Sequence, residues 1–355
     1  MNTLLVTSTA DGTGKTAITI ALAQYAKRNG VDVGYMKPKG TRLESVVGKT
    51  RDEDPMLARE LLDIDAEMHQ LEPVVYSPTF IQEAIRGRED PEDLQRRITD
   101  NFEELSAEKD LMLLEGGGPH WTGSIVDLAD GDIAELLDAQ VLLVTPFDRA
   151  GDVDSILAAA EDLGDRLAGV LFNAVGSAEF VTLTDDVMPF LDGRGIDSVG
   201  AFPHDEQLAG VTVAELADSI GADLLTADAP TDGFVERFSV GAMGSNAALK
   251  QFRRLRNSAV ITGGDRSEIQ TTALEASGVQ CLILTGGYRP PAAVLGKAED
   301  RGIPVILVRS DTRTTIDRIE EVLHSGRTRD AAVIDVMQGL LTDSVDVDSL
   351  LELDE

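Results

Sequence analysis

Short apolar runs alternate with amphipathic stretches along most of the chain. Continuous apolar runs are typical of strands buried on both faces, and the stretches between them repeat with the period of a helix. The pattern therefore predicts a doubly wound, mostly parallel α/β sheet. In the first part of the chain the expected strands are Leu4–Val6, Val31–Tyr35, Leu111–Leu114, Val141–Val144, Gly169–Phe172 and Ser198–Phe202. The expected helices there are Thr16–Arg28, Pro91–Leu105, Asp154–Leu163 and Val213–Ile220.

The pattern lapses near residue 221, because Thr226–Gly233 is rich in turn formers and poor in apolar residues. A second, smaller α/β alternation follows. Its expected strands are Ala259–Thr262, Cys281–Thr285 and Val305–Val308, and its expected helices are Ser267–Ala276, Ala292–Arg301 and Thr314–Leu323. The predicted organisation is a first domain over residues 1–222, a linker over 223–234, a second domain over 235–330, and an acidic C-terminal helix and tail over 331–355.

The charge balance excludes one broad class of function. The chain carries 31 Lys and Arg against 63 Asp and Glu, a net charge of −32. A general DNA or RNA binder needs a basic footprint, so nucleic acid is not an expected partner, and an anionic membrane surface is not one either. Because the acids are spread along the whole chain, we interpret them as the solvated surface of a halophilic protein. An acidic surface for a partner is the alternative.

Cysteine usage and hydropathy point to a cytoplasmic protein. The single cysteine, Cys281, lies in an apolar run and is expected to be a small buried hydrophobe. The N-terminus lacks the basic start and the apolar length of a signal peptide, and no run is long enough for a membrane span.

The strongest chemical signal is the segment Ser8–Thr16, between the first expected strand and the first expected helix. Glycines let the backbone N–H groups of such a loop point at a phosphate, and the helix N-terminus adds its positive dipole end. Lys15 would then reach the β- and γ-phosphates, and the Thr16 hydroxyl would bind Mg²⁺. Thr9 stands where glycine is usual, and a glycine-rich helix cap without a ligand is the alternative. The residues expected to hold the nucleotide here are Asp11, Gly12, Thr13, Gly14, Lys15 and Thr16.

Two carboxylates fit a metal site beside that loop. Glu115 ends an apolar strand and is followed by three glycines, and Asp54 opens a probable helix. Carboxylates at such positions are hard oxygen ligands for Mg²⁺. A solvated helix start is the alternative for Asp54.

Two further polar residues follow expected strands. Lys37 is well placed to hold an anionic substrate or the γ-phosphate, because ligands bind at the carboxyl ends of parallel strands. A lysine that only extends its stem along the surface is the alternative. The amide of Asn173 could contact a purine edge or begin a turn.

Together these motifs resemble the dethiobiotin synthetase family of P-loop ATPases over about residues 1–220. The matching elements are Thr9–Thr16, Tyr35–Pro38, Asp54, Glu115–Gly118 and Gly169–Asn173. Val199–Asp205 and Thr212–Leu216 look like one branch, the N-terminal region of long bacterial phosphate acetyltransferases. The resemblance implies a P-loop NTPase fold, ATP and Mg²⁺ as ligands, and a homodimer. It also implies site residues: Lys15 and Lys37 as catalytic, Asn173 and Pro203 as nucleotide contacts, and Thr16, Asp54 and Glu115 as metal ligands.

The second half resembles the DRTGG domain, which follows the same region in those acetyltransferases. The matching segments are Ile261–Ile269, Leu284–Pro290, Gly302–Val305 and Asp311–Thr315. The resemblance implies a regulatory or ligand-sensing domain. Arg266 and Arg289, beside Gly-Gly turns, could bind a small anion, or they could be structural.

These expectations lead to three candidate functions. The acetyltransferase catalytic domain is not expected in a chain ending at Glu355, so the first is an Mg-ATP-binding regulatory protein whose partner is an enzyme of acetyl phosphate or acetyl-CoA. The second is an ATP-dependent ligase that phosphorylates a carboxylate or carbamate held by Lys37. The third is a structural module with a vestigial loop. Ser8 and Ala10 depart from the synthetase pattern, and Ala10 stands where MinD- and ParA-type ATPases carry a signature lysine, which argues against that branch.

One basic cluster stands out on this acidic chain. Leu249, Phe252 and Leu255 recur at helical spacing within Leu249–Arg256. The cluster is expected either to face an acidic surface, such as a companion subunit, or to pack onto its own domain with exposed arginines.

Overall fold

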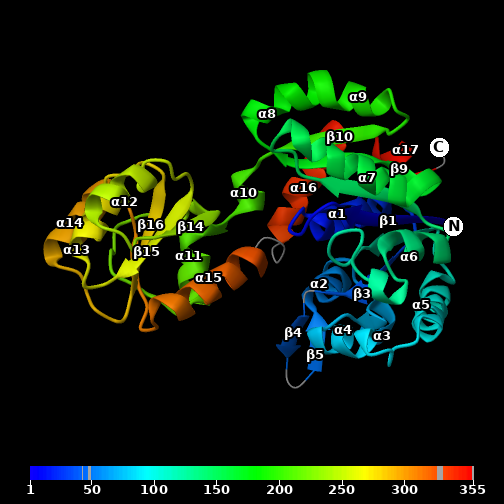
Figure 1. Cartoon of the computed structure of the whole chain (residues 1–355), viewed down its shortest axis with the longest axis horizontal. Coiled ribbons are helices and arrows are strands. Elements are labelled where there is room, and N and C mark those ends of the chain that lie inside the picture. The colour runs from blue at the N-terminus through cyan, green and yellow to red at the C-terminus, as the bar shows by residue number, and fades with distance from the viewer. Residues whose placement is uncertain (42, 47–48, 326–330, 354–355) are drawn as a thin grey trace. The chain divides into compact units, whose positions relative to one another are not determined.

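The computed structural model describes residues 1–355 except 42, 47–48, 326–330 and 354–355. The chain divides into two compact units: Met1–His204 together with Asp330–Glu355, and Asp205–Arg329 (Figure 1). The second unit is therefore inserted into the first. The sequence pattern predicts the first boundary at residue 222, whereas α10, β11 and α11 group with the second unit.

The first unit is built on a six-stranded sheet of order β10-β9-β8-β1-β7-β2, in which every neighbouring pair is parallel. Its strands are β1 (Asn2–Ser8), β2 (Val33–Met36), β7 (Leu111–Glu115), β8 (Gln140–Thr145), β9 (Leu167–Val175) and β10 (Ser198–Pro203). The helices around it are α1 (Lys15–Arg28), α2 (Glu53–Leu61), α3 (Met68–Leu71), α4 (Pro78–Ile85), α5 (Pro91–Ser106), α6 (Asp130–Leu136), α7 (Val153–Leu163), α8 (Ser177–Thr182), α9 (Met188–Asp192), α16 (Ala331–Ser344) and α17 (Val347–Leu351). Shorter helical turns are η1 (Ser124–Val126), η2 (Ala150–Asp152), η3 (Gly164–Arg166) and η4 (Leu183–Val187). Each strand predicted for this part of the chain is present, and the predicted doubly wound α/β class is confirmed.

Small strand pairs beside the main sheet carry part of the site. β3 (Lys39–Gly40) pairs in parallel with β6 (Val74–Val75), and β4 (Leu43–Val46) pairs with β5 (Lys49–Asp52) in an antiparallel hairpin. Pairs this short leave too weak a periodic signal to be predicted from sequence.

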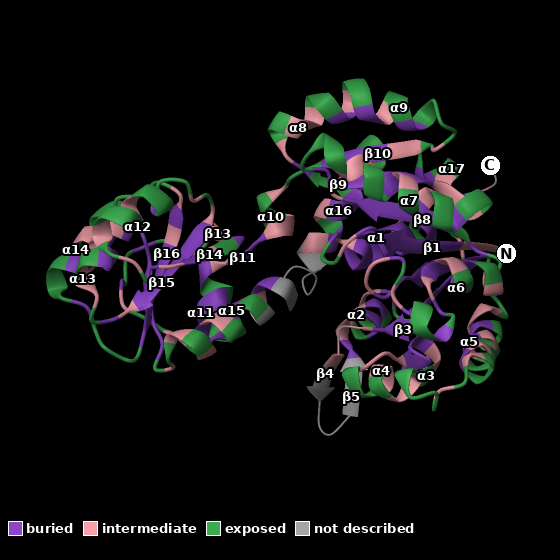
Figure 2. Ribbon diagram, in the orientation of Figure 1, coloured by how far each residue is buried: buried purple, intermediate pink, exposed green. Residues whose placement is uncertain are grey.

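Helix α1 is buried on nearly all sides, because the C-terminal segment covers the side that the sheet leaves open (Figure 2). Ile334, Met337 and Leu341 of α16 are buried, and Gln338 Nε2 donates to Gln24 Oε1 at 3.1 Å. After α16, the backbone of α17 is held by Asn2, whose Nδ2 donates to the Glu352 carbonyl at 2.9 Å. The segment predicted as a helix and a tail is thus an integral layer of the first unit.

The second unit has a five-stranded sheet of order β12-β17-β16-β15-β14, parallel except for β12. Its strands are β12 (Asp223–Leu224), β14 (Arg237–Val240), β15 (Ser258–Gly263), β16 (Val279–Thr285) and β17 (Val305–Leu307), with a separate pair β11 (Val211–Thr212) and β13 (Phe234–Val235). Its helices are α10 (Glu206–Ala209), α11 (Val213–Ser219), α12 (Ser245–Phe252), α13 (Ser267–Ala273), α14 (Ala292–Arg301) and α15 (Thr312–Ser325). Residues 223–234, interpreted from sequence as a linker, thus include a strand that extends the sheet.

Alternation along the central strands of the second unit separates two apolar cores. Leu282 and Leu284 join the core with Phe252, whereas Cys281 and Ile283 join the core on the other face. Cys281 is fully buried, and burial raises the pKa of its thiol to about 12. Cys281 thus lies in the core as the small buried hydrophobe that the sequence predicts.

The helix of the basic cluster packs on the core of its own unit. Helix α12 ends at Phe252, so Leu255 and Arg256 lie beyond it, and Phe252 is buried in the core of its own unit. Arg253 and Arg254 are exposed. Exposed arginines after a helix that packs on its own core do not by themselves indicate an interface.

We expect the thermal stability of the protein to depend strongly on salt. At a net charge of −32, the surface acids repel one another, and lowering the salt from 1 M to 0.1 M lengthens the screening distance from about 3 Å to about 10 Å. The melting temperature should therefore rise steeply between 0.1 M and 1 M NaCl, as measured by circular dichroism. A melting temperature that does not change with salt would instead indicate that the acidic residues form a surface for a partner.

No helix in the described part of the chain combines the length and apolarity required to cross a membrane.

Candidate functional site

The candidate site lies at the carboxyl end of β1, in the middle of the first unit's sheet. Strand β1 is flanked by β7 and β8, and the strand order changes direction there. In open parallel sheets ligands bind at such a point, outside the carboxyl ends of the strands. The loop Thr9–Gly14 connects β1 to α1 at this position, with the N-terminus of α1 directed at the loop.

The loop backbone depends on glycine. Gly12 and Gly14 have φ angles of +68° and +86°, which side chains with a Cβ rarely adopt. A Cβ on Gly14 would also lie 2.6 Å from Nδ2 of Asn173. That same Nδ2 donates to the Thr13 carbonyl at 2.8 Å, so Asn173 at the end of β9 ties the loop to the sheet. The Asn173 amide thus has a structural partner whether or not it also contacts a base.

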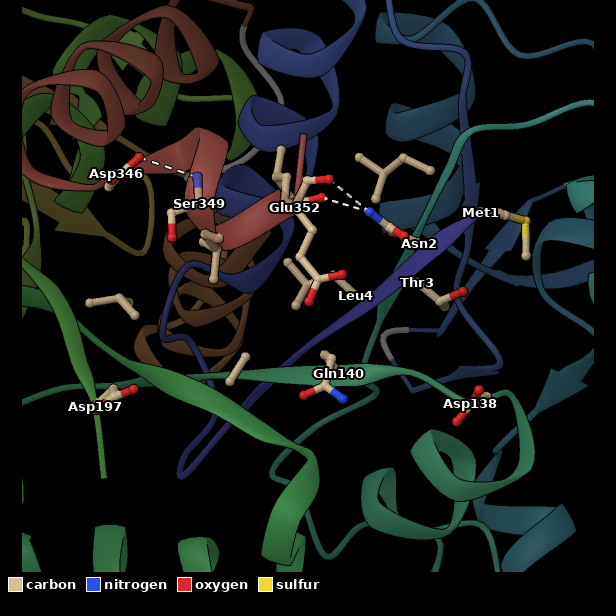
Figure 3. A pocket seen from close by; sticks show the side chains of 15 residues that line it. Met1, Asn2, Thr3, Leu4, Asp138, Gln140, Asp197, Asp346, Ser349 and Glu352 are labelled. Carbon is tan, nitrogen blue, oxygen red and sulfur yellow. Dashed lines mark hydrogen bonds between the residues drawn. The ribbon is translucent and has the colours of Figure 1, made fainter. Parts of the chain in front are cut away.

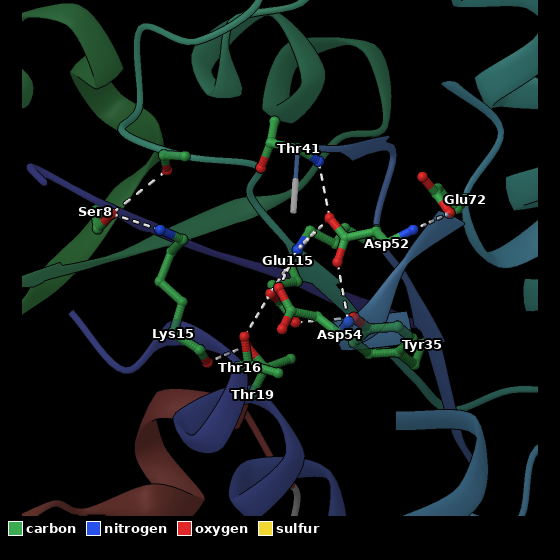
Figure 4. Close-up of polar contacts among 12 residues, drawn as sticks. Ser8, Lys15, Thr16, Thr19, Tyr35, Thr41, Asp52, Asp54, Glu72 and Glu115 are labelled. Carbon is green, nitrogen blue, oxygen red and sulfur yellow. Dashed lines mark hydrogen bonds and ion pairs between the residues drawn. The ribbon is translucent and has the colours of Figure 1, made fainter. Parts of the chain in front are cut away.

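Lys15 lies over the loop and is only 9% exposed. Its Nζ donates to Ser8 Oγ at 2.7 Å (Figure 4), and Ser8 Oγ in turn donates to the Ala10 carbonyl at 2.7 Å. Burial lowers the pKa of Lys15, and the nearby carboxylates of Asp130 and Glu115 oppose that shift. The Thr13 hydroxyl is buried beside it without a hydrogen-bond partner among the described residues. The loop therefore holds a buried ammonium, and it holds a buried hydroxyl that still has no hydrogen-bond partner among the described residues.

Glu115 ends β7 next to the loop and links two elements. Thr16 Oγ1 donates to Glu115 Oε1 at 2.8 Å, and the Tyr35 hydroxyl donates to Oε2 at 2.8 Å. Burial raises the pKa of Glu115 to about 7; Lys37 opposes the rise, and Asp54 and Asp52 add to it. The hydroxyl and carboxylate predicted to bind a metal are therefore in direct contact.

Lys37 is 1% exposed and faces three carboxylates. Its Nζ lies 3.1 Å from Asp52 Oδ2 and 3.2 Å from Glu115 Oε1, and it also pairs with Asp54. Burial lowers the pKa of Lys37, but Asp54, Glu115 and Asp52 together outweigh burial and raise it well above its ordinary value. Lys37 is a charged ammonium inside a buried carboxylate cluster.

Asp52 is a member of this cluster that the sequence analysis did not single out. It is fully buried and caps α2: its Oδ1 accepts from Asp54 N at 2.9 Å, and its Oδ2 accepts from Thr41 N at 2.8 Å. The available signal was its position as a helix N-cap two residues before Asp54, which is a preferred position for aspartate.

A second buried ion pair, Lys39 with Asp130, lies behind the loop and was also missed. Thr7 donates a further hydrogen bond to Asp130. This pair explains the glycines after Glu115, since a Cβ on Gly116 would overlap the Asp130 carboxylate and one on Gly117 would overlap the Lys39 carbonyl. The glycine run makes room for a polar support under the site.

The structure brings most of the predicted site residues together. Thr16, Lys37, Asp54 and Glu115 are connected through the contacts above, and Lys15 is close enough for the charge of Glu115 to act on its pKa. Asp11 and Gly12 are exposed on the loop. Pro203 is exposed at the end of β10, the edge strand separated from β1 by β8 and β9.

The oxygen donors at this point suit a divalent cation that also binds phosphate. Within the described residues no group of three or more His, Cys, Asp or Glu side chains is arranged as a complete metal site. Mg²⁺, however, commonly takes one or two carboxylates plus substrate phosphates and water. The adjacent Thr16 hydroxyl and Glu115 carboxylate, with Asp54 on the same ammonium, fit that requirement.

A cavity of about 570 Å³ lies at the opposite, amino-terminal edge of the sheet (Figure 3). It is lined by the start of β1, by α17 and by acidic residues that include Asp138, Asp197 and Glu352. Acidic side chains dominate its charged lining, and Asp138 is paired with Arg166 at 3.1 Å, so the described residues do not give the cavity the basic lining that an anionic ligand would need. The loop site therefore remains the candidate.

The two arginines singled out in the second unit differ in their surroundings. Arg266 donates to the carbonyls of Gly241 and Met243, at 2.6 Å and 3.1 Å, so it holds the β14–α12 loop. Arg289 is exposed after the turn of Gly286 and Gly287, whose φ angles are +84° and +73°. The structural alternative thus describes Arg266.

Comparison with known families agrees with this geometry. The AAA_26 family model, described as an AAA domain, matches residues 2–212, more than half of the chain. The chain belongs to this family. The DRTGG domain model matches residues 215–322. The predicted combination of a dethiobiotin synthetase-like P-loop domain with a DRTGG domain is confirmed.

Curated relatives of this AAA_26 protein fall into several enzyme groups. It is 24% identical over 343 residues to a phosphate acetyltransferase of Pseudomonas putida, which covers 91% of this chain and 47% of that protein. It is 30% identical over 216 residues to the ATP-dependent dethiobiotin synthetase BioD of Aromatoleum aromaticum, covering 58% of this chain and 91% of that protein. A probable cobyric acid synthase of Methanocaldococcus jannaschii is 25% identical over 58% of this chain and 46% of that protein. The chain spans about half the length of the phosphate acetyltransferases that it matches.

Proposed function

We propose that the first unit binds Mg-ATP at the loop Thr9–Thr16 and that the protein is a regulatory module of acetyl phosphate or acetyl-CoA metabolism. One observation carries the first part. The Lys15 ammonium lies over the loop while Thr16, the next residue, donates to the Glu115 carboxylate at 2.8 Å. Lys15 thus offers a cation to the phosphates, and Thr16, the next residue, offers an oxygen ligand to the metal.

Each group has a defined task in this proposal. The loop N–H groups and Lys15 bind the phosphates, and Thr16, Glu115 and Asp54 hold the Mg²⁺, which neutralises phosphate charge. Asn173 and Pro203 are proposed to border the nucleotide from β9 and β10. The name of the dethiobiotin synthetase relative, which calls that enzyme ATP-dependent, supports the choice of ATP.

The regulatory role is supported by how the chain aligns with the phosphate acetyltransferases. The alignment covers 91% of this chain and 47% of the Pseudomonas putida protein, and the second unit matches the DRTGG domain. We propose that the second unit senses a small ligand and that the partner is an enzyme acting on acetyl phosphate or acetyl-CoA. A cytoplasmic homodimer remains the predicted assembly, which light scattering in high salt can measure.

Titration calorimetry in molar salt tests the nucleotide proposal. Mg-ATP should bind at a single site per chain with a Kd in the micromolar range, on the order of −8 kcal/mol. Absence of heat with Mg-ATP and Mg-ADP alike would reject the proposal.

An ATP-dependent ligase is the second candidate, favoured by the 30% identity to a dethiobiotin synthetase and by Lys37 in the site. In this role Lys37 would hold a carboxylate or carbamate for phosphorylation. Turnover of ATP stimulated by 7,8-diaminononanoate with bicarbonate, or by another carboxylate, would favour it. Binding of ATP without stimulated turnover would favour the regulatory role.

A further inference from the structure

The Lys37 ammonium lies where a metal ion would need the same oxygens. It pairs with Asp54 and lies 3.2 Å from Glu115 Oε1, the oxygen that also accepts from Thr16. These are the three side chains to which we assign the metal in the proposed function, on which this inference rests. All are buried, so water cannot easily replace a lost partner.

We propose that Lys37 acts as an internal counter-ion that holds the metal-binding carboxylates of Asp54 and Glu115 together, and that it is displaced from them when a divalent cation binds, while Asp52 retains it. Two cations cannot share these oxygens at ion-pair distance without strong repulsion. Cation binding and movement of the Lys37 ammonium are therefore one coupled event.

Asp52 is the partner suited to keep Lys37. Its carboxylate lies 3.1 Å from Lys37 Nζ, and it is fixed in place because it accepts hydrogen bonds from the backbone N–H groups of Asp54 and Thr41. Thr16 belongs to α1, whereas Asp52 is the N-cap of α2 and so belongs to the α2 side of the cluster. It is a positioning residue: it gives the displaced ammonium a buried partner.

The displaced ammonium gains a function that it lacks inside the cluster. Freed from Asp54 and Glu115, Lys37 can pair with an anionic group near the metal, either the γ-phosphate or a carboxylate of a second substrate. Lys37 would thus face an anion only when the cation is present, which prevents an anion from binding there alone.

The first test measures binding of Mn²⁺ alone by electron paramagnetic resonance, at about pH 8, where carboxylates are ionised. If Lys37 competes with the cation, Lys37→Gln should bind Mn²⁺ about tenfold more tightly than the wild type. Lys250→Gln removes the same charge from an exposed site in the second unit and should leave the affinity unchanged. Equal or weaker Mn²⁺ binding by Lys37→Gln, or no binding by either protein up to millimolar Mn²⁺, would overturn the proposal.

The second test isolates Asp52 with a double-mutant cycle. Asp52→Asn should weaken Mn²⁺ binding in the wild-type background, because the displaced Lys37 then has no carboxylate to retain it. A purely local loss of negative charge would weaken Mn²⁺ binding equally with or without Lys37. In the Lys37→Gln background the effect of Asp52→Asn should therefore shrink by about tenfold, and an unchanged effect would contradict the role of Asp52.

A thermal melt shows whether Lys37→Gln folds. If it does not fold, Lys37→Arg is the variant that decides the question. A guanidinium binds carboxylates through two parallel hydrogen bonds and should hold Asp54 and Glu115 more firmly, so Mn²⁺ affinity should fall below that of the wild type. Unchanged affinity would overturn the proposal. These measurements use Mn²⁺ without nucleotide. A negative result in them therefore rejects the role of Lys37, whereas the absence of Mg-ATP binding in calorimetry rejects the proposed function.

Discussion

Lys15→Met is expected to abolish measurable ATP binding while the first unit remains folded. The Lys15 ammonium is buried over the loop, and removing one partner of a buried charge pair costs about 2–5 kcal/mol, or roughly 30- to 4,000-fold in affinity. Methionine keeps most of the buried stem, whereas alanine would leave a cavity, since Lys15 is only 9% exposed. Calorimetry with Mg-ATP measures the loss, and a thermal melt checks the fold.

Lys27→Met is the matched control for this experiment. Lys27 lies in the last turn of the same helix, α1, and loses the same charge at an exposed position. Its ATP affinity should equal that of the wild type. Wild-type affinity in Lys15→Met would refute the assignment of the loop as a phosphate site.

The sheet of each unit could be predicted because its central strands are buried on both faces. Runs such as Leu111–Leu114 and Val141–Val144 are continuous and apolar, and the structure buries every residue of both. The two-residue strands β3, β6 and β12 could not be predicted, since so few residues carry no period. The return of α16 to α1 is a long-range contact between residues such as Gln24 and Gln338, which local pattern does not encode.

The candidate site divides in the same way. Lys15, Thr16 and Glu115 stand out because glycine spacing and strand ends mark them. The structure places Thr16 and Glu115 in contact, and Lys15 is near enough for the Glu115 charge to raise its pKa. Asp52 and Asp130 were missed because they are two acids among 63 Asp and Glu, and no sequence pattern separates a buried acid from a solvated one. Their roles depend on Lys37 and Lys39, which reach them only through the fold.

The Gly116–Gly118 run shows why sequence can mark a site without describing it. The glycines after Glu115 drew attention to this strand end, and the structure gives a steric reason for two of them: Cβ atoms on Gly116 and Gly117 would overlap the Asp130 carboxylate and the Lys39 backbone. Glycine is required at positions 116 and 117 by the packing of Asp130 and Lys39, and this requirement does not depend on a bound ligand.

Glu115→Gln is expected to weaken binding of Mg-ATP much more than binding of metal-free ATP. The amide has the shape of the carboxylate, and it can keep its contacts: its oxygen accepts from Thr16, and its NH₂ group donates to the Tyr35 hydroxyl. The lost property is the negative charge, and a neutral amide is a poorer Mg²⁺ ligand. Mg-ATP affinity should therefore fall by at least about tenfold, a loss that outer-shell partners of metal ligands already produce. Calorimetry with ATP in excess Mg²⁺ and in EDTA separates the two affinities.

Tyr35→Phe is the control that tells a metal ligand from a structural residue at Glu115. It removes the 2.8 Å hydrogen bond to Glu115 Oε2 but keeps the carboxylate charge and the Oε1 contact with Thr16. Its ratio of Mg-ATP to metal-free affinity should stay close to that of the wild type, even if both affinities fall slightly. If Glu115→Gln lowers both affinities equally, or if Tyr35→Phe shows the same loss specific to Mg²⁺, then Glu115 acts through the packing around Tyr35 rather than as a ligand.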